Sequence, residues 1–289
     1  MPIVTVSKQS YSPGKEVAEK VAQRLGYECI SGDVLSEASE EFDVPEIELL
    51  RAVRDTPSFL DRFTFGKERR VAYFQAALLN HLQRDNVVYH GLAGHYFVGE
   101  VSHVLKVRII GKIEDRVQLV MRRQDVFRQA AASMSGMPGA ALADVPGEPM
   151  SKEDALRVLH RSDEARRKWG LHLYGIDTHD TSLYDMVVPL NHLSTDEAAD
   201  VICVALRRDR FQTTARSQQA MEDLALAARV KARLIERHPR VNVAADQGTV
   251  WITLEGATRS EEEAIRDAAR EVPGVNKIET RLYPLVAPD

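Results

Sequence analysis

The apolar residues of the chain alternate between short continuous runs and helical spacing, which predicts strands alternating with helices. Four continuous runs predict buried strands, at 3–7, 86–91, 104–110 and 184–190, and a shorter run at 27–30 is compatible with a fifth. Apolar residues three or four positions apart predict helices at 15–25, in several pieces of 34–84, and at 114–123, 151–170 and 194–208. This order predicts an α/β fold with a mostly parallel sheet flanked by helices.

Two segments interrupt the pattern. Residues 129–150 are rich in Ala, Gly, Pro and Met, which predicts a flexible insert in a lid region. Residues 213–221 are polar, which predicts a linker. The chain is therefore expected to form a first domain at 1–212 and a second domain at 222–289.

The second domain is predicted to be a small α+β unit. Its expected elements are a helix, a hairpin, a second helix and a last strand, at 222–237, 240–254, 260–272 and 275–282. The hairpin turns at Asp246-Gln247-Gly248. Trp251 alternates with the apolar residues of its strand, so we expect its side chain on the opposite face, where it can contact a ligand or partner.

The composition indicates a chain that can bury a core and stay in water. Apolar residues make up 44% of it, and the formal net charge of -5 is too small to indicate a nucleic-acid partner. The two cysteines, Cys29 and Cys203, lack the spacing of metal ligands and are expected in the core. With no signal-peptide pattern and no apolar run of roughly 18 residues, we expect a cytoplasmic protein without a transmembrane segment.

The first predicted strand, the turn after it and the following helix have the layout of a phosphate-binding loop. Such a loop aims backbone N–H groups at phosphate oxygens from the head of a helix, and a lysine adds positive charge. Gly14 and Lys15 stand where the motif has Gly-Lys, whereas Gln9 and Glu16 replace its first glycine and its Ser/Thr. Pro13 contributes no N–H. The residues alone are therefore also compatible with an ordinary strand–turn–helix.

The segment from Ser7 to Ala18 resembles the loop of the cytidylate kinase-like family of P-loop proteins, which also carries glutamate at the position of Glu16. Further resemblances follow in order through residue 208: the strand and glycine turn at 87–94, Glu-Asp-Arg-Val at 114–117, Val-Met-Arg-Arg at 120–123, the basic lid helix at 163–167, Tyr-Asp-Met-Val-Val at 184–188 and the closing helix at 197–202. Several positions depart from the family. Leu92 stands in place of its arginine and Ser31 in place of its aspartate, and the loop lacks two of the family's glycines, at Ser10–Tyr11 and at Pro13.

The second domain resembles a BON domain. The resemblance rests on three segments: Val241-x-Val243, Gly248-x-Val250-x-Ile252-x-Leu254-x-Gly256 and Val272-Pro273-Gly274-Val275-x-x-Ile278. It implies a small module that binds a membrane or another ligand. The ligand or protein partner of such a module is left unknown by the sequence.

The resemblance of the first domain implies ATP-dependent phosphoryl transfer, with Mg²⁺, to CMP or another small phosphate acceptor. The residues implied to bind the donor are Ser12, Gly14, Lys15, Glu16, Arg116 and Arg123. The residues implied to act on the transferred group, as a lid at 128–168 closes, are Lys15, Arg122, Arg161, Arg166 and Arg167. Mg²⁺ would bridge the donor phosphates with few protein ligands. The altered loop keeps two alternatives open, a nucleotide sensor without catalysis and a scaffold that no longer binds nucleotide.

Overall fold

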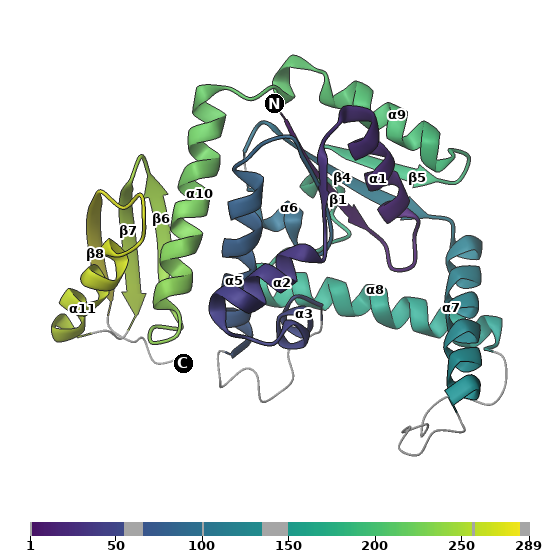
Figure 1. Cartoon of the computed structure of the whole chain (residues 1–289), viewed down its shortest axis with the longest axis horizontal. Coiled ribbons are helices and arrows are strands. Elements are labelled where there is room, and N and C mark those ends of the chain that lie inside the picture. Colours follow the sequence, from purple (N-terminus) through teal and green to yellow (C-terminus); the bar gives the residue numbers. More distant parts are fainter. Residues whose placement is uncertain (1, 55–65, 100, 135–149, 256–257, 284–289) are drawn as a thin grey trace.

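The computed structural model describes residues 2–54, 66–99, 101–134, 150–255 and 258–283 (Figure 1). A five-stranded sheet forms the centre of the N-terminal part of the chain, in the order β2-β3-β1-β4-β5. Its strands are β1 (Ile3–Lys8), β2 (Glu28–Ile30), β3 (Val87–His90), β4 (Val104–Gly111) and β5 (Met186–Leu190). All neighbouring strands are parallel, so their carboxyl ends meet at one edge of the sheet. The predicted α/β fold with a parallel sheet is confirmed.

Helices cover both faces of this sheet because both faces are apolar. On one face, α1 (Gly14–Leu25) and α9 (Thr195–Leu206) pack over Val4 and Val6 of β1. On the other face, Ile3 belongs to a second core that includes α2 (Asp33–Phe42), α3 (Glu46–Arg54), α5 (Gly66–Leu82) and α6 (Gly94–Phe97). Both predicted core cysteines are at least partly buried, Cys203 fully so.

Two long helices reach beyond the sheet. They are α7 (Ile113–Met134), which follows β4, and α8 (Lys152–Tyr174), which runs below the sheet from α3 to α7 (Figure 1). Their contact buries a small cluster of Val117, Val120, Ala155 and Leu159, against which Tyr11 of the loop after β1 packs. The predicted flexible insert at 129–150 is thus helical as far as Met134, and residues 135–149 lie outside the described residues. Two short 3₁₀ turns, Thr181–Leu183 and Asp209–Phe211, flank β5 and α9.

The C-terminal part has the element order helix, hairpin, helix, strand. It consists of α10 (Ala215–Leu234), β6 (Asn242–Asp246), β7 (Thr249–Glu255), α11 (Arg259–Arg270) and β8 (Lys277–Tyr283). β6 and β7 are antiparallel, and β7 and β8 are parallel. In the hairpin turn, Gln247 and Gly248 have φ angles of 47° and 78°, in the left-handed region. Tight two-residue hairpin turns require this region, and glycine adopts it without strain. The predicted hairpin and the strand after the second helix are confirmed.

The C-terminal part is attached along the whole of α10, which packs against α5 (Figure 1). Buried residues of α10, β7 and α11 belong to the same apolar core as α5. Gln218 Nε2 also donates to the carbonyl oxygen of Gln83 at 3.1 Å. We expected residues 213–221 to form a linker, but Thr214 caps a helix that begins at Ala215.

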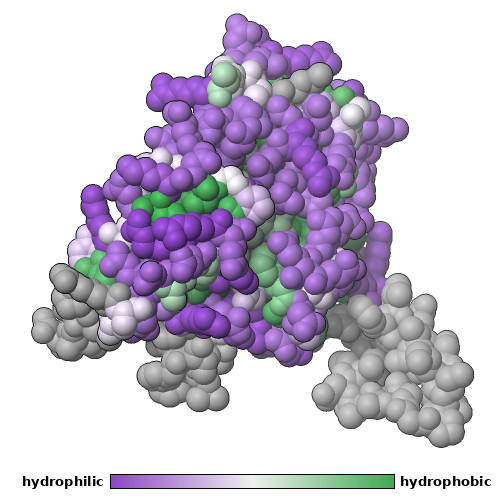
Figure 2. Space-filling view, turned by 60° about the vertical axis from the view of Figure 1, so that its left-hand side comes forward, coloured by the Kyte–Doolittle hydropathy of each residue, from purple (hydrophilic) through white to green (hydrophobic). Residues whose placement is uncertain are grey.

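The face of the molecule on the side of the C-terminal sheet is mainly hydrophilic, with a small apolar patch among polar side chains (Figure 2). Trp251 lies on the strand β7 between Val250 and Ile252, both of which are fully buried. Its own side chain is only half-buried. The predicted alternation of faces at Trp251 is confirmed, and its contact with a ligand stays a prediction.

Candidate functional site

The loop between β1 and α1 brings backbone N–H groups to the head of a twelve-residue helix. Gly14 begins this helix, and a Cβ at Gly14 would lie 2.8 Å from Cβ of Lys8, so only glycine fits here without a shift. Among the described residues, the backbone N–H groups of Gly14 and Lys15 have no hydrogen-bond partner, as is usual for the first turn of a helix. They are therefore available to an anion at the positive end of the helix dipole.

Positive charge gathers around Lys8, at the end of β1. Burial lowers the pKa of the Lys8 ammonium, and repulsion from Arg166, Lys15 and Arg123 lowers it further. Lys15 is 63% exposed and lies 3.5 Å from Glu19, one turn further along α1. Four cations from β1, α1, α7 and α8 thus surround the loop, an arrangement that suits a polyphosphate.

The loop is held in place at Ser10, which is 1% exposed. Arg116 Nε donates to the carbonyl oxygen of Ser10 at 2.8 Å, and Arg116 Nη2 donates to Asp163 Oδ2 at 2.6 Å. The Ser10 amide in turn donates to Asp163 Oδ1 at 3.2 Å. These three residues, the Ser10 clamp, tie α7 and α8 to the loop.

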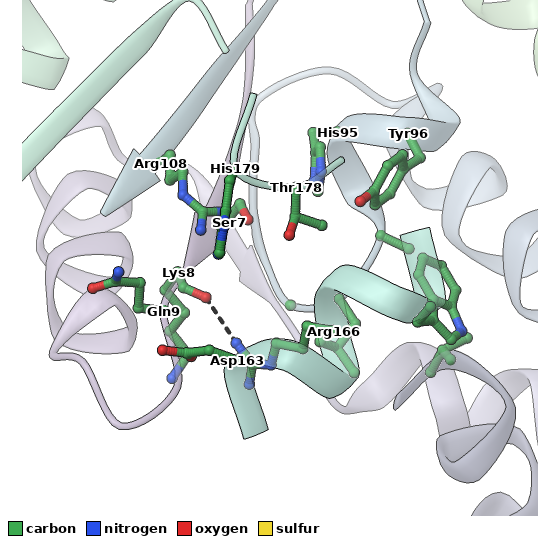
Figure 3. Close-up of a pocket in the computed structure, with 15 residues that line it drawn as sticks. Ser7, Lys8, Gln9, His95, Tyr96, Arg108, Asp163, Arg166, Thr178 and His179 are labelled. Atoms are coloured by element: carbon green, nitrogen blue, oxygen red, sulfur yellow. Dashed lines mark hydrogen bonds between the residues drawn. The ribbon is translucent and has the colours of Figure 1, made fainter. Parts of the chain in front are cut away.

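A pocket that is partly open to solvent lies beside the loop (Figure 3). It is lined by the ends of β1 and β3, by β4 and α8, and by residues 178–179. Figure 3 shows Arg108, His95 and Thr178 on one side of it and Lys8 and Arg166 on the other. Open parallel sheets bind ligands at the carboxyl ends of their strands, where this pocket lies.

One wall of the pocket is aromatic and apolar. The rings of Tyr96 and Trp169 lie 5.6 Å apart, and Val53 and Leu92 line the same wall. Trp169 Nε1 donates to the carbonyl oxygen of Ala52 at 2.7 Å, which fixes α8 against α3. The pocket therefore combines an apolar wall with a basic one, which is typical of sites for small amphiphilic ligands.

Arg108, His95 and Tyr184 form a polar group next to this wall, since the rings of His95 and Tyr96 lie 3.9 Å apart. Arg108 is 8% exposed, and its Nη1 donates to the hydroxyl of Tyr184 at 2.9 Å. The same hydroxyl lies 3.3 Å from Nε2 of His95 and 3.3 Å from the carbonyl oxygen of Thr178. Burial, with repulsion from Arg108 and Lys106, lowers the pKa of His95 to about 3, so its ring is neutral at physiological pH.

Comparison with known proteins places the first domain. Residues 3–135 match the cytidylate kinase-like family. A cytidylate kinase of Methanopyrus kandleri is 22% identical over 213 residues, which cover 71% of this chain and 92% of that protein. Cytidylate kinases of Pyrobaculum neutrophilum and Pyrobaculum aerophilum are 40% and 38% identical over 60 residues. That stretch covers 19% of this chain and only a third of the length of each of those relatives.

Solved structures match the chain over a similar range. An uncharacterized protein of Eubacterium ventriosum matches 71% of this chain with a TM-score of 0.47 and 16% identity. A shikimate kinase of Bacteroides thetaiotaomicron matches 72% of it with a TM-score of 0.41 and 10% identity. The match to the cytidylate kinase-like family, over residues 3–135, includes the loop, β3, β4 and α7.

The structure gives two predicted donor-binding residues other partners. The Ser12 amide donates to the carbonyl oxygen of Gln9 at 3.3 Å, and its hydroxyl donates to the same oxygen at 2.9 Å. Glu16 accepts from the Thr195 hydroxyl at 2.5 Å and lies 2.9 Å from Nζ of Lys20, and these contacts lower the pKa of its carboxyl. Ser12 and Glu16 would have to leave these partners to reach a nucleotide, so their roles stay predictions.

The predicted arginines fall into three groups. Arg166 Nη1 donates to the carbonyl oxygen of Lys8 at 2.7 Å, beside the pocket (Figure 3), and Arg116 belongs to the Ser10 clamp. Arg167 instead faces Asp177, to which its Nε donates at 2.8 Å. The remaining three lie exposed on α7 and α8: Arg122, Arg123 and Arg161. The structure thus brings Arg116, Arg123 and Arg166 to the loop, and it does not bring Arg167 there.

Sequence reasoning assigned no role to Arg108, although this residue lines the pocket. The sequence feature that could have identified Arg108 is its position in the middle of an apolar run, because a charged residue is unusual in a buried strand. Leu92, at the position of the family's arginine, lines the same pocket. One guanidinium of this pocket therefore comes from β4 and another, Arg166, from α8, whereas the turn after β3 contributes the apolar Leu92.

Two searches of the described residues gave negative results. In the described ranges, no three His, Cys, Asp or Glu side chains gather closely enough to hold a metal ion. No helix in the part of the chain that the structure describes is long and apolar enough to span a membrane.

Proposed function

We propose that this protein is a Mg²⁺-dependent kinase that transfers the γ-phosphoryl group of ATP to a nucleoside monophosphate, CMP or a closely related acceptor. The observation that carries the proposal is the convergence of the first-turn amides of α1 with Lys8, Lys15 and Arg166 beside the pocket. The loop suits the donor phosphates and the pocket suits the acceptor, the two requirements of phosphoryl transfer by positioning. The match of residues 3–135 to the cytidylate kinase-like family supports the same activity.

On the donor side, the amides of Gly14 and Lys15 bind phosphate oxygens, and the Lys15 ammonium contacts the β- and γ-phosphates. Ser12 and Glu16 join them only after turning away from their present partners. Mg²⁺, which would arrive with ATP, would neutralise negative charge on the donor phosphates.

On the side of the transferred group, Arg166 acts from the edge of the pocket. Arg122 and Arg161 extend from the facing helices α7 and α8, and movement of these helices towards the loop brings their guanidinium groups to the phosphates. Arg123, which is implied to bind the donor, already lies near the loop. Arg167 takes part only if its ion pair with Asp177 opens. Each guanidinium stabilises charge that develops on the phosphoryl oxygens during transfer.

The test is release of ADP from ATP in a coupled assay, with Mg²⁺ and each nucleoside monophosphate in turn. Lys15→Ala should lower kcat/KM by on the order of a hundredfold while the fold is kept, because it removes a charge from the donor phosphates. Lys277→Ala is the matched control, an exposed lysine of β8 that pairs with Glu279. Absence of ADP release by the wild-type protein with every monophosphate would refute the kinase.

A nucleotide sensor without turnover is the second candidate. It is favoured by the Ser10 amide, which is already bound to Asp163 and is therefore not available to a phosphate oxygen. A sensor should show a rise in melting temperature with ATP, since a ligand at a hundred times its Kd stabilises by about 2.7 kcal/mol, without ADP release. A scaffold should show neither effect.

We propose that the C-terminal part is a BON-like module that binds a ligand or partner through the open face of its sheet. Trp251, half-buried on that face, supports this. Trp251→Ala should leave phosphoryl transfer unchanged and weaken whatever the module binds. A loss of ADP release in this variant would contradict a separate binding role.

A further inference from the structure

Arg108 is a buried cation without an acidic partner. It is 8% exposed, and no carboxylate among the described residues lies within ion-pair distance of it. One of its five N–H groups donates to Tyr184, whose ring centroid lies 5.3 Å from the guanidinium carbon. A buried charge is costly unless an anion pairs with it, so Arg108 has unused capacity for one.

The groups around Arg108 also face the pocket and can bind a polar ligand. Arg108 and His95 both line the pocket (Figure 3). Nδ1 of His95 is buried and has no hydrogen-bond partner in the described part of the chain. Because burial keeps the His95 ring neutral, it adds a hydrogen-bonding group and no charge. The pocket therefore offers one fixed cation and one neutral polar ring on the same wall.

Tyr184 holds the guanidinium in position. Its hydroxyl accepts from Arg108 and lies within 3.3 Å of both His95 Nε2 and the Thr178 carbonyl oxygen. A restrained guanidinium loses less side-chain freedom when it binds a planar or tetrahedral anion in a bidentate manner. The position of Arg108 is thus set before a ligand arrives.

The wall that faces Arg108 is also basic. Arg166 and Lys8 line the opposite wall, so an anion with two charges fits better than one with a single charge.

We infer that Arg108, held by Tyr184 and flanked by His95, binds the phosphate monoester of the acceptor. This inference rests on the proposed function for the identity of the acceptor, and it adds that Arg108 is the residue that binds the acceptor's phosphate. The apolar wall of Tyr96, Trp169 and Leu92 then receives the rest of the acceptor.

The test is isothermal titration calorimetry with CMP, cytidine and inorganic phosphate, and with ATP as an independent probe of the loop. The wild-type protein should bind CMP more tightly than cytidine. Arg108→Met should remove this preference, with affinity for CMP on the order of tenfold to a hundredfold lower, since a charge-assisted hydrogen bond is lost. Affinity for ATP should change less than about twofold.

Three further variants separate recognition from folding. Tyr184→Phe keeps the guanidinium but removes the hydroxyl that positions it, so it should lower the preference for CMP over cytidine, though by less than Arg108→Met does. The double variant Leu92→Arg with Arg108→Met returns a cation to the pocket and should restore part of the preference for CMP over cytidine. Such a recovery would show that the loss in Arg108→Met comes from the missing charge and not from poor folding. Arg270→Met, at an exposed ion pair on α11, should have no effect.

The outcomes are distinct. Equal affinity for CMP in Arg108→Met and wild type would overturn the inference, as would binding of neither CMP nor inorganic phosphate by the wild type. Equal loss of CMP and cytidine binding in Arg108→Met would point to a structural role and would also overturn it. CMP binding that depends on Arg108 without ADP release would leave the inference standing and refute the proposed kinase.

Discussion

Replacing Arg116 with methionine is the sharpest test of how the loop is held. The side chain of Arg116 is 5% exposed and that of Asp163 is 22% exposed, so their ion pair is largely removed from water. Methionine keeps the stem of the side chain, which passes 3.1 Å from the position of a Cβ at Gly111. The substitution therefore removes the guanidinium with little loss of packing.

The magnitude follows from the bonds that are lost. Breaking a buried ion pair from one side costs about 3–5 kcal/mol, since the remaining charge is left unpaired. Asp163 is partly exposed and keeps its bond from the Ser10 amide, which lowers this cost. The carbonyl oxygen of Ser10 loses its donor at 2.8 Å, which adds about 1 kcal/mol. Together these terms predict a loss of about 3 kcal/mol in the free energy of unfolding.

The assay is urea denaturation followed by circular dichroism, with ATP binding measured alongside. Arg157→Met is the matched control, because Arg157 lies on α8 in an exposed ion pair with Asp154 and should leave the urea midpoint unchanged. Adding Asp163→Asn to Arg116→Met should cost much less than the sum of the two single changes. A loss below about 1 kcal/mol in Arg116→Met, or strict additivity in the double variant, would refute the reasoning.

Three other substitutions test separate features. Burial and neighbouring cations lower the pKa of Lys8, so the charged side chain destabilises the folded state at any pH below that lowered pKa. Lys8→Met should therefore raise the melting temperature at pH 7, and the increase should shrink as the pH rises towards 10.5. The same variant should bind ATP more weakly. A lower melting temperature at pH 7 would contradict this. Gly14→Ala should cost about 1–3 kcal/mol in urea denaturation, because its Cβ would lie 2.8 Å from Lys8 Cβ; an unchanged midpoint would show that the loop yields. Ser194→Ala removes the cap of α9 and should cost about 1 kcal/mol, which a thermal melt measures, and no change would mean that water replaces the hydroxyl.

The strands could be predicted because a strand that is buried on both faces has apolar residues at consecutive positions. The run predicted at 104–110 became β4, Val104–Gly111, and the run at 3–7 became β1, Ile3–Lys8. The start of α10 could not be predicted in this way. Its first turn is polar, and its cap is the reciprocal pair Thr214–Ser217, which lacks the acidic residue that usually marks a capping box.

The candidate site was only partly predictable, for a physical reason. Gly14 and Lys15 are neighbours in sequence, so the loop carries a local signal. The Ser10 clamp joins residues 106 and 47 positions apart, and a single sequence holds no trace of such pairings. Arg108 reaches the pocket only because β4 lies next to β1 in the sheet. Which side chains meet there depends on topology, and topology came from the structure.

The long contact between α10 and α5 has a mechanical consequence. α5 also touches α2 and α3, and α3 is fastened to α8 through Trp169 and the carbonyl oxygen of Ala52. A continuous series of packed helices, α10, α5, α3 and α8, therefore connects the C-terminal sheet with the wall of the pocket. A partner that bound the C-terminal sheet would have a contiguous path of packed side chains to that wall.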